Sequence, residues 1–230
     1  MKANPLILAQ FPSTSWLGAQ FLVRQVARAD LALVGTRQGL LFAIGGRDGP
    51  HDHASVEVLD VVANTWSPCA SLRRPRSAVA AVECGGHIFA IGGWRQGEAA
   101  HGGLCDVEAL APAAARPGGE WTVAAPMRSG RAFPGAAALG GRIYVLGGRT
   151  AAAEVYEPGA DAWAPVSSLS QPRWGPAVGA DVVGGRVFAA GGNLWEGASL
   201  DSAECLDPRE GRWRPLPLLP FEFWGAAAVW

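Results

Sequence analysis

The sequence predicts an all-β protein made of four copies of one four-stranded unit and the beginning of a fifth. The main observation is an apolar run that ends in a pair of glycines and occurs four times, at Gly45-Gly46, Gly92-Gly93, Gly147-Gly148 and Gly191-Gly192. The second glycines of these pairs are 47, 55 and 44 residues apart. A period of about 45 to 50 residues is typical of solenoids, propellers and other repeat architectures.

Each copy contains the signals of four short strands in a fixed order. An apolar strand and a turn precede the strand that ends in Gly-Gly; a variable loop, a strand with a glutamate, a turn and a strand with a tryptophan follow. The strands are β-branched or aromatic and are bounded by Gly, Pro, Asp and Asn. The copies fall at about 31–68, 77–123, 132–165 and 175–215, and 223–230 corresponds to the first strand of a fifth unit.

The distance from each repeated tryptophan to the residue at the arginine position is the same in all four copies. Three of the tryptophans precede an arginine by ten residues, and in the fourth copy a phenylalanine takes the place of the arginine: Trp66/Arg76, Trp121/Arg131, Trp163/Arg173 and Trp213/Phe223. Residues 1–29 fit worst and form an irregular N-terminal segment, in which Trp16 and Arg28 are the candidates for a degenerate copy of the same pair.

Composition limits the classes of function. The chain has 230 residues, of which 49% are hydrophobic and 17% charged, enough for a sizeable core. Its net charge is −1 and it has no basic stripe, so nucleic acid is not an expected partner. No apolar run approaches the length of a membrane span, so no membrane association is expected. The four cysteines lack C-x-x-C spacing, which predicts reduced thiols in a cytoplasmic protein.

The recurring order of Gly-Gly, Glu and Trp resembles the kelch repeat, and the resemblance covers residues 30–230. It implies a β-propeller, in which each unit is one blade around a central channel. Kelch propellers usually have five to seven blades, whereas this sequence completes four and begins a fifth. Either the chain is a fragment of a longer protein, or Leu6–Phe11 and Thr14–Leu17 complete the last blade beside Phe223–Trp230.

The glycine pairs and the four repeated tryptophans are expected to be structural. Glycine tolerates positive φ and allows close approach of another backbone, and no G-x-G-x-x-G phosphate loop is present. One tryptophan per unit, repeated in register, predicts packing between blades. The repeated glutamates, Glu57, Glu108, Glu154 and Glu204, are expected to be buried and hydrogen-bonded, not to form one catalytic set.

Arg76, Arg131 and Arg173 have two interpretations. They stand just before each innermost strand. The resemblance to kelch adaptors that bind acidic peptides implies that arginines at this position contact the ligand. A guanidinium group is also well suited to bind a carboxylate. The alternative is that they pair with the repeated glutamates. We include them among the candidate partner-binding residues.

The other candidate partner-binding residues lie in the loops after Gly-Gly, which differ in every copy. They are Trp94, Arg149, Asn193 and Trp195, and Trp174 and Trp224 follow the arginine position and are candidates for the same channel mouth. Trp and Arg are favoured at the centres of interfaces.

The expected function is non-enzymatic protein binding on one propeller face, with no cofactor and no metal. The pair His51 and His53 is a weak metal signal because the sequence fixes no third ligand. The resemblance implies a substrate-recognition propeller of the ubiquitin-ligase adaptor type, although the sequence has no room for the BTB domain of such adaptors, so a cullin-type ligase is reached only through an upstream domain. The alternatives are a kelch-type enzyme (isomerase, oxidase or specifier protein) and an actin- or cytoskeleton-binding kelch protein.

Overall fold

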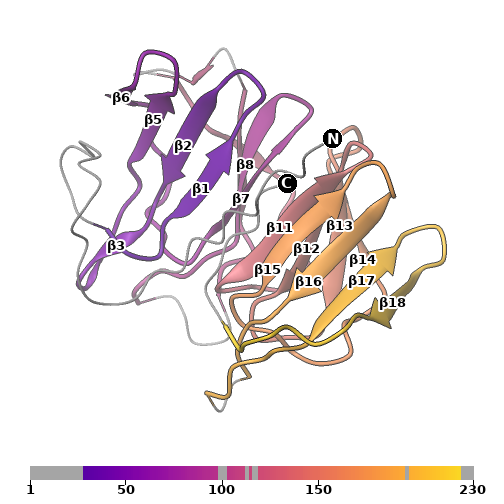
Figure 1. Cartoon of the computed structure of the whole chain (residues 1–230). Helices are drawn as coiled ribbons and strands as arrows, with labels where there is room; N and C mark the ends of the chain where they lie inside the picture. The colour runs from indigo at the N-terminus through magenta and orange to yellow at the C-terminus, as the bar shows by residue number, and fades with distance from the viewer. Residues whose placement is uncertain (1–27, 98–102, 112–113, 116–118, 195–196, 224–230) are drawn as a thin grey trace.

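The all-β prediction is confirmed by a computed structural model, which describes residues 28–97, 103–111, 114–115, 119–194 and 197–223. It contains four separate antiparallel sheets of four strands and one small two-stranded hairpin, β3–β4 (Figure 1). We call the four sheets blades 1 to 4 in chain order. No helix in the described part of the chain is long and apolar enough to cross a membrane.

The strands of each blade follow the chain from the inside outwards. Blade 1 consists of β1 (Ala32–Gly35), β2 (Leu40–Ile44), β5 (Val56–Asp60) and β6 (Thr65–Pro68), with β3 (Arg47–Asp48) and β4 (His51–Asp52) in its loop. Blade 2 consists of β7 (Ala80–Cys84), β8 (His87–Ile91), β9 (Val107–Leu110) and β10 (Thr122–Ala124). Blade 3 consists of β11 (Pro134–Leu139), β12 (Arg142–Gly147), β13 (Ala153–Glu157) and β14 (Ala162–Val166). Blade 4 consists of β15 (Ala177–Asp181), β16 (Arg186–Ala190), β17 (Ala203–Asp207) and β18 (Arg212–Pro215).

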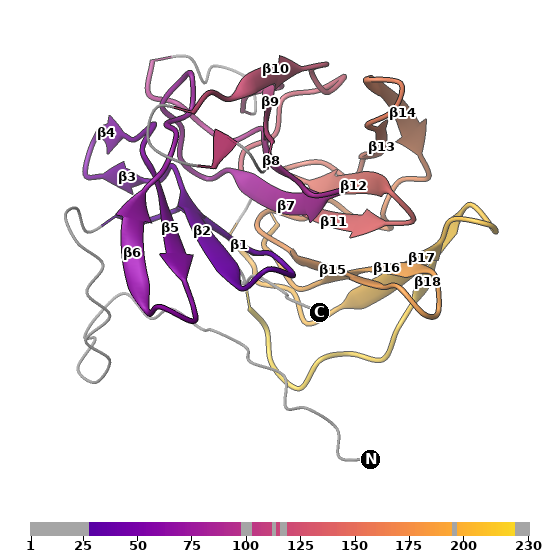
Figure 2. The same cartoon turned by 90° about the horizontal axis from the view of Figure 1, so that it is seen from above.

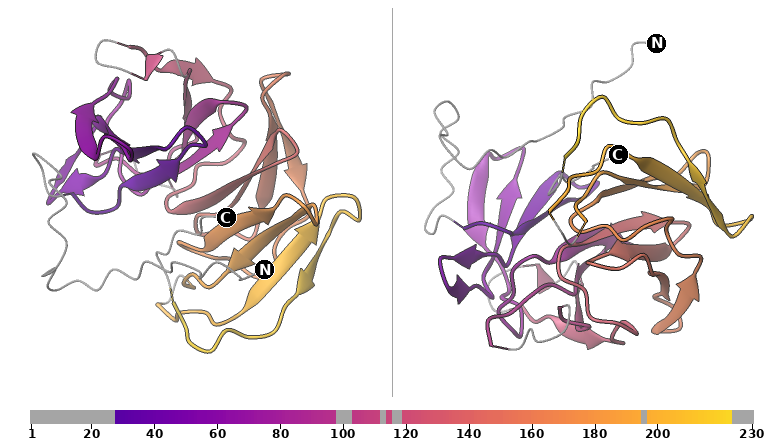
Figure 3. Two further views of the ribbon diagram at one scale, coloured as in Figure 1. Left: turned by 45° about the horizontal axis from the view of Figure 1, so that its top comes forward. Right: turned by 90° about the horizontal axis from the view of Figure 1, so that it is seen from below.

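The blades are arranged in chain order, with the first strand of each next to the first strand of its neighbour. Contacts join β1 to β7, β7 to β11 and β11 to β15, and Figures 2 and 3 show the sheets fanning out from these inner strands. The apolar cores lie between successive blades. The third strand of blade 2 is therefore covered on both faces, and all four residues of β9, including Glu108, are buried.

The repeated tryptophans join each blade to the one before it. The indole N–H of Trp121 donates to the carbonyl of Ala70 (2.8 Å), that of Trp163 to Ala125 (2.7 Å) and that of Trp213 to Ser167 (2.8 Å). Each acceptor stands four residues after the tryptophan of the preceding blade. This geometry is the one expected of inter-blade packing residues.

The first glycine of each pair lies against the backbone of the following blade. A Cβ atom on Gly147 would be 2.7 Å from the carbonyl oxygen of Arg173, and the residue has a φ of +72°. Gly45, Gly92 and Gly191 are equally close to the carbonyls of Arg76, Arg131 and Phe223. A side chain at this position would therefore separate two blades.

Several expectations about the chain ends lie outside the described residues. These include the strands expected at Leu6–Phe11 and Thr14–Leu17, the role of Trp16, and the strand expected after Phe223. Phe223 itself forms an isolated bridge with Leu200, and its carbonyl accepts the N–H of Gly192 (2.8 Å). It therefore occupies the position that Arg76 and Arg131 occupy beside earlier glycine pairs.

Candidate functional site

The three predicted arginines are buried and paired. The Nη2 atom of Arg76 lies 2.5 Å from Oε1 of Glu108, that of Arg131 lies 2.8 Å from Oε1 of Glu154, and that of Arg173 lies 3.0 Å from Oε1 of Glu204. The arginine side chains are no more than 1% exposed. Each pair lies within a single blade.

The remaining hydrogen bonds of these groups also repeat. Nη1 of Arg131 donates to the carbonyls of Gly147 (2.7 Å) and Ala152 (2.8 Å), and Arg76 and Arg173 make the corresponding two bonds. The second carboxylate oxygen of Glu154 accepts the N–H of Arg128 (2.8 Å). Burial lowers the pKa of the Arg76 guanidinium, while the carboxylate of Glu108 opposes this shift. A charge held by an opposite charge and several dipoles is stable in the interior.

Arg28 makes the same contacts in blade 1. Its guanidinium binds Glu57 (3.1 Å) and the carbonyls of Gly45 (3.1 Å) and Ser55 (2.9 Å). Arg28 is thus the counterpart of Arg76, as the sequence suggested. Its presumed partner in the degenerate copy, Trp16, lies outside the described residues.

This geometry corrects the assignment of the arginines as partner-binding residues. A guanidinium with no exposed surface, already bound to a carboxylate and two carbonyls, cannot be reached by an acidic peptide. Of the two interpretations that the sequence left open, the structure favours pairing with the repeated glutamates.

A ladder of backbone hydrogen bonds crosses one end of the four innermost strands, and we call this end the channel mouth. It joins the residues two positions after each arginine: the N–H of Ala78 donates to Asp30 (2.8 Å), that of Phe133 to Ala78 (2.9 Å) and that of Gly175 to Phe133 (3.0 Å). All four residues have positive φ, and Asp30, Ala78 and Phe133 adopt it without being glycine. Such conformations cost about 1–3 kcal/mol each and are concentrated at functional sites.

The loops after Gly-Gly leave at the same mouth. In blades 1, 2 and 4 the first loop residue bridges the residue after the arginine of its blade: Arg47 pairs with Ala29, Trp94 with Ser77 and Asn193 with Trp174. In blade 3, Thr150 bridges Arg173 instead. Trp94 and Asn193 are half-buried and Arg149 is exposed. The backbone N–H of Arg149 donates to the carbonyl of Arg173 (3.4 Å), so all three predicted residues lie beside the arginine segments at this mouth. Trp195, the fourth, lies outside the described residues.

Two aromatic rings lie on this rim. Phe133 and Trp174 are in edge-to-face contact, with ring centroids 5.3 Å apart and planes at 84°, and both are half-buried. The sequence suggested Trp174 but not Phe133. The residues at the position of Phe133 in other blades are Asp30, Ala78 and Gly175, so only a constant distance from the arginine could have identified it.

A family model described as the kelch motif matches residues 31–73, 75–128, 130–170 and 176–219. The chain belongs to the kelch family. The sequence prediction of the family is therefore confirmed, together with the four-stranded units on which it was based.

Two relatives of this kelch chain are much longer proteins. It is 33% identical over 183 residues to Kelch-like protein 35 of Mus musculus, covering 79% of this chain and 30% of the relative. It is 28% identical over 188 residues to Beta-scruin of Limulus polyphemus, covering 73% of this chain and 19% of the relative. The chain thus spans less than a third of the length of these two proteins.

Among solved structures, that titled "Structure of YjhT" has a TM-score of 0.69 at 15% identity, covering 85% of this chain and 67% of that one. This last match supports the kelch propeller fold.

The other end of the innermost strands, which we call the opposite mouth, contains an open pocket of about 320 Å³. The turns between first and second strands line it, with Arg37, Glu83, Leu139 and Val182 among the side chains. Val182 is 69% exposed and Val183 is 96% exposed at the tip of one turn. None of the residues predicted to bind a partner lines this pocket.

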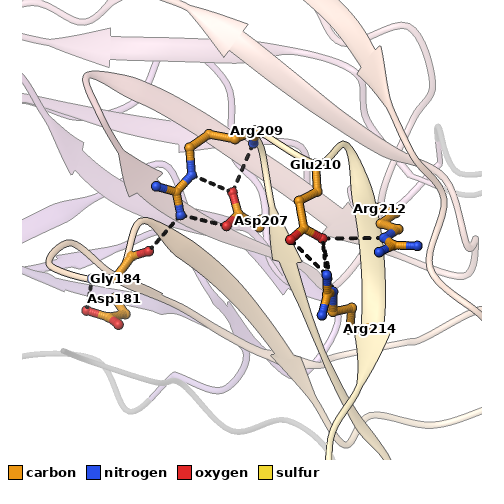
Figure 4. Close-up of polar contacts among 7 residues, drawn as sticks. All are labelled: Asp181, Gly184, Asp207, Arg209, Glu210, Arg212 and Arg214. Carbon is orange, nitrogen blue, oxygen red and sulfur yellow. Dashed lines mark hydrogen bonds and ion pairs between the residues drawn. The ribbon is translucent and has the colours of Figure 1, made fainter.

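Charges on the outer edge of blade 4 largely neutralise each other. Arg209 binds Asp207 and reaches the carbonyl of Gly184, while Glu210 binds Arg212 and Arg214 (Figure 4). The hydrogen bond from the side chain of Arg209 lowers the pKa of Asp207 to about 2. Paired charges of this kind discourage pairing of an edge strand with other chains, and they leave little net charge for recognition.

The loop of blade 1 contains the two histidines that gave a weak metal signal. His51 and Asp52 lie in β4, and Oδ2 of Asp52 accepts the N–H of Gln96 in the loop of blade 2 (2.8 Å). Arg47 in β3 binds Asp30 on the ladder (2.6 Å). These contacts hold the blade 1 loop beside the channel mouth and the neighbouring loop.

Proposed function

We propose that this kelch chain is a protein-interaction module that binds its partner on the mouth where the Gly-Gly loops emerge. One observation carries the proposal: the backbone ladder and the bridges Ser77/Trp94 and Trp174/Asn193 hold variable loop residues on one rim of a repeated scaffold. Variable residues on a rigid frame are how repeat proteins achieve specific binding. Non-glycine residues held at positive φ on this rim support the same conclusion.

We further propose that the module recognises substrates for a ubiquitin-ligase adaptor in the cytoplasm. Similarity to Kelch-like protein 35 and to Kelch-like ECH-associated protein 1B of Danio rerio, which is 36% identical over 85 residues, supports this assignment. The four free cysteines, three of them buried, fit a reducing compartment. Recruitment of a cullin would require a domain other than the propeller described above.

Site-specific photo-crosslinking in cells tests the binding face. A benzoylphenylalanine at Trp94 or Arg149 should crosslink to a discrete partner protein, identified by mass spectrometry. The same group at Val62 or Val183, which are 90% and 96% exposed on turns at the opposite end of the blades, is the matched control. Crosslinks obtained only from Val62 and Val183 would contradict the proposed face. Recovery of a ligase substrate that accumulates on depletion of the protein would support the adaptor role.

A further inference from the structure

The rings of Phe133 and Trp174 are fixed on the channel rim by backbone bonds on both sides. The N–H of Phe133 donates to Ala78, and its carbonyl accepts the N–H of Gly175 (3.0 Å). Trp174 and Asn193 exchange two hydrogen bonds, of 2.9 and 2.8 Å. The protein therefore loses little conformational freedom when a ligand contacts these rings, and this favours affinity.

The bridge between Trp174 and Asn193 places a side chain with hydrogen-bond donors next to the two rings. Both rings are half-buried, so each retains a surface open to contact. Oδ1 of Asn193 accepts the hydroxyl of Ser199 (3.0 Å), which fixes the orientation of the amide. Among the described residues the Nδ2 group of Asn193 has no acceptor, so its N–H groups are available to a ligand. An amide donor beside aromatic rings suits a peptide carbonyl next to an apolar side chain.

Charge at this mouth does not favour an acidic ligand as strongly as the sequence indicated. The arginines predicted to bind carboxylates, Arg76, Arg131 and Arg173, are buried in the interior, each bound to a glutamate. On the rim, the guanidinium of Arg47 is paired with Asp30 at 2.6 Å, and Arg149 is the exposed arginine among the predicted partner-binding residues. The aromatic pair therefore provides the main contact surface, and aromatic side chains contribute most to well-packed interfaces.

We propose that Phe133, Trp174 and Asn193 form an anchor site for an extended, uncharged peptide segment with one large aliphatic or aromatic side chain. That side chain packs on the two rings, and the adjacent peptide carbonyl accepts the Asn193 amide. The inference rests on the proposed function, because it names the chemistry of the partner that binds at the same mouth.

A random 12-residue peptide library displayed on phage provides the probe. Selection on the full chain should enrich Leu, Ile, Phe or Trp at one position, with few Asp or Glu residues beside it. The affinity of synthetic peptides from the selection is then measured by fluorescence polarisation. Phe133→Ala and Trp174→Ala should each weaken binding at least about tenfold, as for central interface aromatics, and Asn193→Ala about three- to tenfold.

Two controls separate recognition from folding. Val183→Ala, at the opposite mouth, should leave peptide affinity unchanged. Because Phe133 and Trp174 are partly buried, each variant is first compared with the parent by thermal unfolding, and Trp174→Phe should retain most of the binding. Unchanged affinity in folded Phe133→Ala and Trp174→Ala would overturn the anchor site.

Failure of the anchor site and failure of the proposed function give different results. Enrichment of acidic peptides, or peptides that bind at the rim independently of the two rings, would overturn the inference while the proposed function remains. Selected peptides whose affinity falls only in variants of Val182 and Val183 would contradict both the anchor site and the proposed function, since binding would then occur at the opposite mouth.

Discussion

Blades 1 and 3 have the same strands and the same repeated residues, but only blade 3 has a described blade on each side. The indole N–H of Trp163 donates to Ala125 in the preceding connection, whereas the buried indole N–H of Trp66 has no acceptor among the described residues. On the innermost strands, Leu33 is 40% exposed, while its counterpart Ala136 packs against the core shared with blade 2. A kelch blade is therefore stable in part through groups that its predecessor supplies.

The turns before these two tryptophans differ in the same way. Asp161 and Asn64 both have positive φ, at 46° and 51°. Oδ1 of Asp161 accepts the N–H of Ala125 (2.8 Å) and the hydroxyl of Tyr156 (2.6 Å), so it joins blade 3 to blade 2. No corresponding bond from Asn64 is present in the described part of the chain. The comparison predicts that equivalent substitutions will be more costly in blade 3.

The largest expected effect concerns the buried ion pairs. Arg131→Met should reduce the free energy of unfolding by about 3–5 kcal/mol, because it leaves the buried carboxylate of Glu154 uncompensated. Arg28→Met should cost less, since the side chain of Glu57 is 15% exposed, against 4% for Glu154. Urea unfolding of both variants measures the difference. The double variant Arg131→Met/Glu154→Leu should recover much of the loss, and equal losses in the two single variants would contradict the comparison.

The tryptophan bonds should give an intermediate effect. Trp163→Phe removes a donor and leaves the carbonyl of Ala125 unpaired, at a cost of about 1–3 kcal/mol beyond lost packing. Trp66→Phe removes an N–H that has no described acceptor, so its cost should be limited to packing. Chemical denaturation of the two variants under identical conditions checks this order; a larger loss for Trp66→Phe would show that its indole is bonded in solution.

The smallest effect is a dependence on pH. Hydrogen bonds from the Ala125 N–H and then from the Tyr156 hydroxyl lower the pKa of Asp161 below its usual 3.8. A lowered pKa in the folded state means that this contribution is present above about pH 4 and is lost as the pH falls through the folded-state value. Asp161→Asn should therefore flatten the acid limb of the stability profile, whereas Asn64→Ala should leave it unchanged. Identical acid limbs in Asp161→Asn and the parent would refute this assignment.

Most of the fold could be predicted because its determinants recur at fixed distances. Gly147, Trp163 and Glu154 each have counterparts in the other blades, and strand order follows from their sequence. The role of Arg131 could not be decided in the same way, because an arginine suits both a buried carboxylate and an acidic ligand. Only the three-dimensional contact with Glu154 distinguishes the two.

The rim was less predictable than the frame. The position of Phe133 is conformationally constant across the blades but chemically variable, so a search for recurring residue types does not find it. Trp94 and Asn193 were predicted from loop variability, and the structure brings both to the mouth. A repeated backbone position with changing side chains is therefore the signal to seek in related repeats.

The confinement of each arginine–glutamate pair to one blade has a consequence for how the chain folds during synthesis. As each blade leaves the ribosome, its own arginine can meet its own glutamate without waiting for later sequence, and domains generally form in this N-to-C direction. The tryptophan bonds point back to residues already synthesised. Among the contacts described above, those between a glycine pair and the next arginine backbone, and the bond between Asp52 and Gln96, need residues that are synthesised later. Each buried arginine can thus pair with its glutamate while later blades are still being translated. A pause between blades would leave mainly apolar and backbone groups exposed to chaperones.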